Sequence, residues 1–238
     1  MKRVEFFKFS KNLIMATWKF IVIDWTDWSG KWTQTKLLVE RLQKEWFAVE
    51  MADFPQYWQR SAAMVEDYLN WKFGTAQKVW PYRASVFYAV DRYEAAPRIR
   101  QRLDEWKIVV ANRYVSSNMW HQAWKIHDLK ERDKFLEWLD EFEYWLFWIP
   151  RPDINILLYM PTEIWQQLVD MKWKREYTDK KRDIHEADLQ HLKDAAEAYK
   201  YVAEKYNRII IDSAPDGNLL SIDEISDILR KKVISLLN

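Results

Sequence analysis

Short apolar runs alternate with amphipathic helical segments along this chain of 238 residues. The apolar runs predict strands at about residues 19–24, 47–52, 107–111, 153–159 and 207–212. Several runs are continuous, which is typical of strands buried on both faces of a parallel sheet. The remaining segments predict helices at about 31–45, 59–70, 81–104, 131–143, 162–172, 186–205 and 222–236. We therefore expect an α/β protein, a five-stranded parallel sheet flanked by helices in a doubly wound three-layer α/β/α arrangement.

Composition narrows the class of protein further. The net charge is +1, so no overall field attracts the chain to nucleic acid or to an anionic membrane. The apolar runs FIVI and NILLYM are too short to span a bilayer, which needs about 20 apolar residues. The absence of cysteine excludes disulfides and thiolate metal sites. We expect a cytoplasmic protein without nucleic-acid or membrane partners. In it, residues 1–17 are a disordered or miscalled extension and 18–238 form one domain.

The chain has 16 tryptophans and only 3 glycines, although glycine usually makes up about 7% of a protein. Helix C-termini and tight turns need positive φ, which glycine adopts most readily. Many of the tryptophans stand at such places. Trp46 and Trp106 follow helical segments and precede strands, and Trp58 and Trp80 flank turns. Only Trp138, in KFLEWLDEF, stands where a helix would bury an aromatic ring.

A codon read with the wrong table would explain this pattern, because UGA means glycine in some bacterial genetic codes and tryptophan in others. Glycine at the fifteen positions other than Trp138, added to the 3 glycines present, would restore an ordinary content of about 7%. The alternative is a tryptophan-rich natural or engineered chain. UGG codons at Trp25, Trp28 and Trp46 would contradict the recoding hypothesis. The chain with glycine at all fifteen positions is hereafter called the glycine form.

The first apolar run leads into WTDWSGKWTQT at residues 25–35. With glycine for tryptophan this stretch contains G-x-x-x-x-G-K, from position 25 to Lys31, between a strand and a helix. The spacing predicts a phosphate-binding loop. Backbone N–H groups at a helix N-terminus would converge on phosphate oxygens, and Lys31 would reach the terminal phosphates. Indoles at positions 25, 28 and 32 would occupy the space of a triphosphate, so we expect the printed chain to need glycine there.

Six motifs, in order along the chain, carry a close resemblance to the thymidylate kinase family. They are the phosphate loop, DFPQYWQ at 53–59, YAVDRY at 88–93, NRYVSSN at 112–118, PDINILLYMP at 152–161 and KREYTDKKRD at 174–183. The resemblance covers about residues 18–236. It implies a P-loop NTPase fold with a short lid at about 173–185 and an enzyme that moves the γ-phosphoryl group of Mg-ATP to dTMP. It also implies a homodimer.

The resemblance implies two binding sites. ATP would be bound by the phosphate loop and one lid arginine, that is by Trp25, Thr26, Asp27, Trp28, Ser29, Gly30, Lys31, Trp32, Thr33 and Arg175. The acceptor dTMP would be bound by Asp27, Phe54, Tyr57, Tyr88, Arg92, Arg113, Ser117, Asn118 and His121. In this second set, Tyr88 would stack on the base and Arg92 would donate to its carbonyl edge. Arg113 would clamp the acceptor phosphate, a role that suits a planar, always charged guanidinium.

The catalytic roles implied by the resemblance fall to Lys31, Arg113, Arg182 and Asp27. The phosphate loop contains no arginine, so we expect the lid to neutralise the transferring group, with Arg182 the first candidate. Asp27 would face the 3′-hydroxyl of the acceptor sugar, because a carboxylate repels phosphate.

Magnesium is expected to arrive with ATP. In this chain Asn112 replaces the aspartate of the family pattern DRYxxS, and no Ser or Thr follows Lys31. We therefore expect the metal to be held by Thr33 and Asp91.

Three readings of function remain open on the sequence. The first is an ATP-dependent dTMP kinase, in which no strong base is needed because the acceptor phosphate is already anionic. The second is another nucleoside monophosphate or deoxynucleoside kinase on the same fold. The third is a nucleotide-binding scaffold without catalysis, favoured by Asn112 and by the missing hydroxyl after Lys31. For Tyr88 and Arg92 the alternatives are a core aromatic residue and a surface ion pair.

Overall fold

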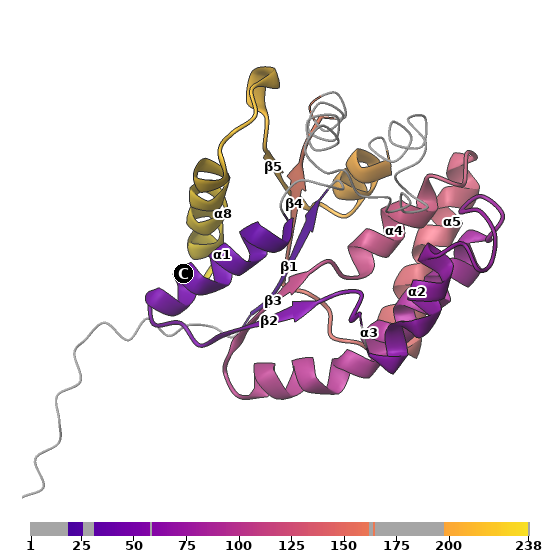
Figure 1. Cartoon of the computed structure of the whole chain (residues 1–238), viewed down its shortest axis with the longest axis horizontal. Coiled ribbons are helices and arrows are strands. Elements are labelled where there is room, and N and C mark those ends of the chain that lie inside the picture. Colours follow the sequence, from indigo (N-terminus) through magenta and orange to yellow (C-terminus); the bar gives the residue numbers. More distant parts are fainter. Residues whose placement is uncertain (1–18, 26–30, 58, 162–163, 165–197, 238) are drawn as a thin grey trace, which may run out of the picture.

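The computed structural model describes residues 19–25, 31–57, 59–161, 164 and 198–237. At its centre lies a five-stranded parallel sheet of strand order β2-β3-β1-β4-β5 (Figure 1). The strands are β1 (Phe20–Trp25), β2 (Val49–Asp53), β3 (Ile108–Asn112), β4 (Ile154–Tyr159) and β5 (Ile209–Asp212). Each strand lies where an apolar run predicted it, so the predicted sheet is confirmed.

Helices cover both faces of this sheet and form two separate cores (Figure 1). Successive side chains of a strand point to opposite faces. Ile21, Ile23 and Trp25 accordingly pack with α1 (Lys31–Lys44) and α8 (Ile222–Leu237). Phe20 and Val22 pack on the other face, whose helices are α3 (Pro81–Asp104), α4 (Val115–Ala123), α5 (Leu129–Asp140) and the helical residues 198–205. The predicted three-layer architecture is therefore confirmed.

Most of the predicted helices are present. The helix expected at 59–70 is a 3₁₀ turn, η1 (Arg60–Ala62), followed by α2 (Ala63–Leu69), and α5 continues into a π-helix, η2 (Glu141–Leu146). A 3₁₀ turn, η3 (Pro215–Gly217), precedes α8. The helix α4 was not predicted, because nearly all of its residues are buried and it has no exposed polar face to mark it as a surface helix. The predicted helix at 162–172 and the lid at 173–185 lie outside the described residues, except Ile164.

Several helices are followed, in the turn that closes them, by a tryptophan in the left-handed backbone region. In the described residues, seven non-glycine residues have positive φ, and four of them are tryptophans. Trp46 (φ 69°) follows α1 and Trp106 (φ 60°) follows α3, each in the turn after the helix, while Trp71 (φ 63°) follows α2 and Trp148 (φ 49°) follows η2. Left-handed geometry costs an L-residue roughly 1–2 kcal/mol and costs glycine almost nothing. Trp46 and Trp106 are among the positions at which the sequence predicts glycine.

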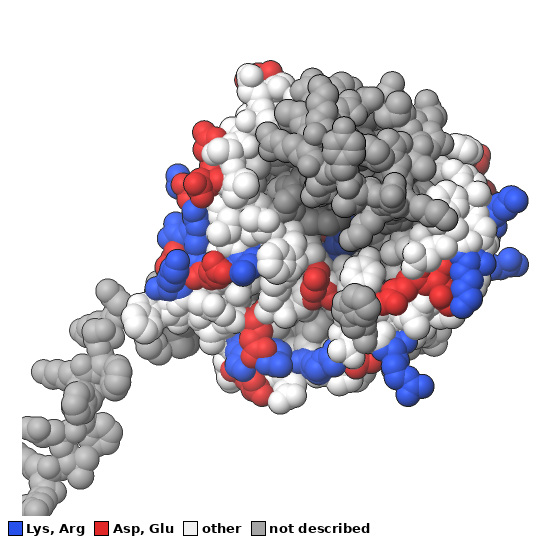
Figure 2. Space-filling view, viewed as in Figure 1, with Lys and Arg blue, Asp and Glu red and all other residues white. Residues whose placement is uncertain are grey.

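The outer surface carries charges of both signs. Figure 2 shows lysine and arginine interspersed with aspartate and glutamate over the visible face. This mixture agrees with the net charge of +1. Within the part of the chain that the structure describes, no helix has the length and apolar character needed to cross a membrane.

Candidate active site

The expected site lies at the carboxyl edge of the sheet, where β1, β2 and β3 end. The register brings Ile23 beside Asn112 and Asp53 beside Asn112, so the three strand ends meet at one place. β1 ends at Trp25 and α1 begins at Lys31, which leaves the predicted phosphate loop between them. Seven predicted site residues and the side chain of Lys31 lie outside the described part. The seven are Thr26, Asp27, Trp28, Ser29 and Gly30 of the loop, and Arg175 and Arg182 of the lid.

The described tryptophans of the loop have different environments. The ring of Trp25 is fully buried between β1, α1 and α8. It therefore does not occupy the space of a bound triphosphate, contrary to the expectation for position 25. Trp32 is exposed in the first turn of α1, with the Lys36 ammonium 5.0 Å from its ring centroid. Thr33, the predicted metal ligand, is half-buried in the same turn.

Arg113 directly follows β3 and adopts a left-handed backbone (φ 63°). A strained conformation of this kind persists only where the surroundings enforce it, and such residues cluster at functional sites. Its Nη1 lies 3.5 Å from Ser117 Oγ and 2.7 Å from His121 Nε2. A guanidinium can only donate, so His121 Nε2 accepts and the ring proton is on Nδ1. Three predicted acceptor residues are thus in contact.

Arg92 forms a buried ion pair with a residue that the sequence did not single out, Glu143 of η2. Arg92 Nε donates to Glu143 Oε2 at 2.6 Å and Nη2 donates to Oε1 at 2.5 Å. Burial acts to lower the pKa of Arg92, but the adjacent Glu143 carboxylate outweighs it and raises the pKa, so the guanidinium stays charged. Asn118 Nδ2 donates to the same carboxylate at 3.3 Å. The pair is buried, so Arg92 is not the surface ion pair of the alternative interpretation.

Aromatic rings pack between these polar groups and β2. Phe54 is buried just past β2, and its ring centroid lies 5.5 Å from that of Tyr114. The carbonyl oxygen of Tyr114 lies 3.5 Å from Arg92 Nη1. Tyr88 is half-buried on α3 and meets Tyr68 edge-on at 6.2 Å, whereas Tyr57 is exposed. Phe54, Arg92 and Arg113 therefore meet around Tyr114, whereas the contacts of Tyr88 and Tyr57 lie elsewhere.

A second buried cluster supports the end of β1. Asp24 accepts hydrogen bonds from Ser116 Oγ and, at 2.5 Å, from Ser117 Oγ, both at the start of α4. Burial raises the pKa of Asp24, and the two serine hydrogen bonds act against that rise. Arg208 Nη1 lies 4.0 Å from the same carboxylate. Asp24 and Arg208 were missed at the sequence level. The cluster holds α4, and with it the predicted pocket residues, against the strand that enters the phosphate loop.

The predicted metal ligand Asp91 is already engaged by the protein. Its Oδ1 accepts from Ser61 Oγ at 2.7 Å and its Oδ2 accepts from the backbone N–H of Gln56 at 2.8 Å. Asp53, not singled out from the sequence, lies nearer the strand ends and accepts from Asn112 Nδ2 at 2.6 Å. Asn112 Oδ1 is buried and accepts no hydrogen bond from the described residues.

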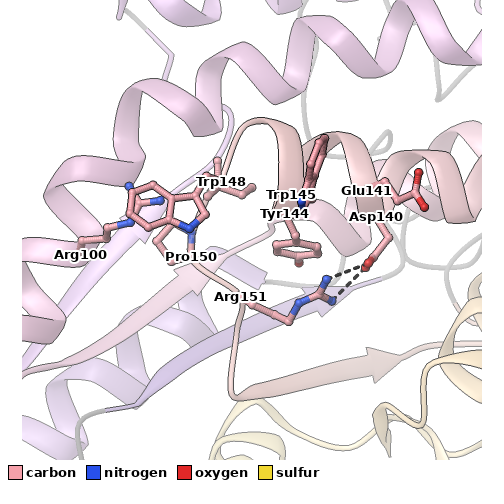
Figure 3. A pocket seen from close by; sticks show the side chains of 9 residues that line it. Arg100, Asp140, Glu141, Tyr144, Trp145, Trp148, Pro150 and Arg151 are labelled. Atoms are coloured by element: carbon pink, nitrogen blue, oxygen red, sulfur yellow. Dashed lines mark hydrogen bonds and ion pairs between the residues drawn. The ribbon is translucent and has the colours of Figure 1, made fainter.

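A pocket lies at the other edge of the sheet, beside the residues that lead into β4. Figure 3 shows it between η2 and the end of α3, with Trp148 and Tyr144 on its walls and the Arg151 guanidinium paired to Asp140. The two Arg151–Asp140 hydrogen bonds measure 3.0 and 2.7 Å. Ile154 opens β4 just after this pocket, whereas the predicted site residues follow the strand ends. The pocket is therefore separate from the candidate active site.

The parallel sheet of this order, with a glycine-lysine loop between its first strand and first helix, defines a P-loop NTPase fold. A family profile described as Thymidylate kinase matches residues 23–221, which is most of the chain. The chain therefore belongs to the thymidylate kinase family. Membership of this family implies a phosphotransferase that uses ATP as its phosphoryl donor.

Individual relatives agree with the profile at modest identity. The thymidylate kinase of Mycobacterium tuberculosis is 28% identical over 146 residues, which are 60% of this chain and 67% of that protein. A probable thymidylate kinase of Methanocaldococcus jannaschii is 26% identical over 194 residues, 82% of this chain and 86% of that protein. A solved thymidylate kinase from Candida albicans shares the fold with a TM-score of 0.65 over 92% of both chains, at 19% identity.

Proposed function

We propose that the protein is an ATP-dependent dTMP kinase that makes dTDP in pyrimidine deoxynucleotide synthesis. The observation that carries the proposal is the convergence of three predicted acceptor residues around Tyr114. Phe54 contacts its ring, Arg92 its carbonyl oxygen, and Arg113 precedes it at the end of β3. An aromatic wall, a hydrogen-bonding pair and a charged fork are the features that a pyrimidine monophosphate requires.

Positioning and charge neutralisation supply most of the catalysis in phosphoryl transfer. In the proposed mechanism the loop amides and Lys31 hold the triphosphate, and Arg113 holds the acceptor phosphate. Arg182 and Arg175 of the lid would neutralise the transferring group, and Asp27 would orient the acceptor sugar. None of these residues has to remove a proton, because the attacking phosphate oxygen is already anionic.

Magnesium fits this site as a metal that comes with its substrate. Mg²⁺ keeps several waters and takes one or two carboxylates together with substrate phosphates. The described residues contain no group of three or more His, Asp or Glu side chains arranged to hold a metal. The residues that would hold it are Thr33 and Asp53, with the open Oδ1 of Asn112 beside them. Asp91 would first have to give up its hydrogen bonds to Gln56 and Ser61. When bound, the metal would neutralise charge on the donor phosphates.

An acceptor panel tests the proposal. The printed chain and the glycine form are each supplied with Mg-ATP and with dTMP, dUMP, dCMP, UMP or thymidine, and ADP formation is measured. We expect the glycine form to prefer dTMP. A preference for thymidine would replace the proposal by a nucleoside kinase. ATP binding without formation of dTDP would instead favour the scaffold interpretation.

Assembly and location are part of the same proposal. Membership of the family supports a homodimer and a cytoplasmic enzyme without nucleic-acid partners. Sedimentation equilibrium of the glycine form is expected to give twice the chain mass of 29.2 kDa, less the mass lost with the indoles. A monomer at micromolar concentration would remove the dimer from the proposal.

A further inference from the structure

Glu143 occupies an unusual place in the fold. It lies in η2, a single π-helical turn that continues α5, and its side chain is 0% exposed. π-helical turns are rare and occur often at functional sites. The turn projects Glu143 toward α3 and α4, where its carboxylate contacts Arg92 and Asn118. One buried carboxylate thus joins two of the predicted dTMP-binding residues.

The carboxylate fixes which atoms of Arg92 remain available. Nε and Nη2 of Arg92 are both used by Glu143 in a two-pronged pair. Both N–H groups of Nη1 and the second N–H of Nη2 point away from Glu143, and the contact of Nη1 is a long one, 3.5 Å to the Tyr114 carbonyl oxygen. A guanidinium held at two of its nitrogens cannot rotate, because its five N–H groups form a rigid fork. These N–H groups of Nη1 and Nη2 are the hydrogen-bond donors that remain for a ligand.

The same carboxylate fixes the orientation of Asn118. Asn118 Nδ2 donates to Glu143 Oε1 and to the Ser85 carbonyl oxygen, each at 3.3 Å. Turning the amide by 180° would place its oxygen against these two acceptors, so the nitrogen must stay on that side. Asn118 Oδ1 is buried and accepts no hydrogen bond from the described residues. A buried acceptor without a partner costs free energy that a ligand N–H can recover.

We propose that Glu143 is a positioning residue that selects an imide base, thymine or uracil, over cytosine. This inference rests on the proposed function and adds the residue that sets its specificity for the base. An open donor at Arg92 and an open acceptor at Asn118 complement the C4 carbonyl and the N3–H of an imide. Cytosine presents an amino group and an unprotonated nitrogen at those two places. The amino group would face the donor of Arg92, and the lone pair of the nitrogen would face the oxygen of Asn118. Buried contacts between two donors or two acceptors discriminate strongly against such a base.

Asp140 provides a matched control on the same stretch of chain. It makes a two-pronged pair with Arg151, but that pair is partly exposed and lies beside the separate pocket of Figure 3. Asp140→Asn removes a carboxylate from an ion pair of the same type without touching the acceptor residues. A purely structural role for Glu143 would affect folding and overall activity, but it would not alter the choice between two bases.

The test compares Glu143→Gln, Glu143→Asp and Asp140→Asn in whichever of the two forms makes dTDP. The quantities measured are kcat and KM for dTMP, dCMP and ATP, with Tm as a check on folding. For Glu143→Gln we expect the dTMP:dCMP ratio of kcat/KM to fall at least about tenfold, with the KM for dTMP raised and the KM for ATP unchanged. Asp140→Asn should leave the ratio within about twofold.

Glu143→Asp keeps the charge and should recover part of the ratio. If Glu143→Gln does not fold, Glu143→Asp decides instead, because its shorter carboxylate should still lower the ratio about threefold. An unchanged ratio in a folded variant overturns the proposed role of Glu143 and leaves the dTMP kinase proposal intact. A wild-type protein that phosphorylates no pyrimidine monophosphate overturns both proposals together.

Discussion

Trp138 and the tryptophans at the helix ends have opposite environments. Trp138 lies within α5, half-buried, with its ring stacked on Phe142 at 5.0 Å and packed against Tyr82 at 4.6 Å. Trp46 and Trp106 follow helices in left-handed backbone, and their side chains are 95% and 71% exposed. The first residue has the burial and aromatic contacts that stabilise an indole. The other two have backbone strain with little burial to offset it.

This difference supports glycine at the helix ends of the natural protein. A β-carbon is disfavoured in the left-handed region, and a glycine at this position closes a helix at no such cost. The recoding hypothesis separates the same two groups. It predicts UGA codons at Trp46 and Trp106 and a UGG codon at Trp138. Sequencing the gene tests it directly, and UGG at the helix ends would leave the strain without a coding explanation.

Three buried tryptophans, Trp25, Trp120 and Trp124, belong to neither group. Trp120 lies in α4, so the expectation that a helix would bury only Trp138 is wrong. Trp25 and Trp120 are fully buried, one in each core, and the indole N–H of each has no acceptor among the described residues. A buried donor without a partner costs roughly 1–3 kcal/mol, which argues against tryptophan at these positions. Glycine there would require the surrounding side chains to close over the removed volume. The glycine form is therefore expected to differ most from the printed chain around these two rings.

The largest expected effect concerns ATP. In the printed chain, Trp28→Gly with Trp32→Gly removes two indoles from the predicted phosphate loop, and we expect ATP affinity to rise at least about a hundredfold. Trp25→Gly is kept out of this variant because its ring lies in the core. Isothermal titration calorimetry with Mg-ATP measures the change. Tight ATP binding by the printed chain itself would refute the expectation.

The next effect is a loss of stability at Trp138. Trp138→Gly removes a half-buried ring and places glycine inside a helix, so we expect the free energy of unfolding to fall by about 3 kcal/mol. Urea denaturation followed by circular dichroism measures it. Trp138→Phe is the control, because it keeps an aromatic ring at the position and should cost less than half as much. If Trp138→Gly leaves the free energy of unfolding unchanged, Trp138 does not differ from the tryptophans at the helix ends in the way proposed.

Substitution at the helix ends should have the opposite sign. Trp46→Gly and Trp106→Gly, made separately, relieve left-handed strain and should each raise the free energy of unfolding by about 1 kcal/mol. Trp80→Gly serves as control, because Trp80 is also exposed but has φ −54°. With no strain to relieve there, it should be neutral or slightly destabilising. The comparison fails if all three variants shift the urea midpoint in the same direction.

Local patterns in the sequence were sufficient to predict the sheet and most helices. The strands of a parallel sheet are apolar runs, and α1 and α8 have one apolar face each, so each element carries its own signal. The helix α4 carries none. Its residues Ser116, Ser117 and Asn118 have low helix propensity and are buried by neighbours on every side. Tertiary packing decides the structure of such a segment.

The candidate site likewise contains some residues that the sequence could predict and others that it could not. Phe54 and Arg113 belong to contiguous motifs, so their place at the strand ends could be predicted. Glu143 could not be predicted, because its partner Arg92 is 51 residues away and no spacing rule links an α3 residue to a π-helical turn. Arg208 and Asp24 are separated still further along the chain. Ion pairs between distant segments leave no periodic trace in a single sequence.

The smallest effect is expected at Trp148, where strain and a favourable contact coexist. Its φ of 49° favours glycine, but the Arg100 guanidinium lies 4.2 Å from its ring centroid. A cation–π contact at an exposed site contributes about 0.5–1 kcal/mol, close to the strain that glycine would relieve. Trp148→Gly should therefore change the free energy of unfolding by less than about 0.5 kcal/mol. In an Arg100→Ala background the contact is absent, and Trp148→Gly should then stabilise by nearly as much as Trp46→Gly. Equal effects of Trp148→Gly in both backgrounds would show that backbone strain alone distinguishes these tryptophans from Trp138.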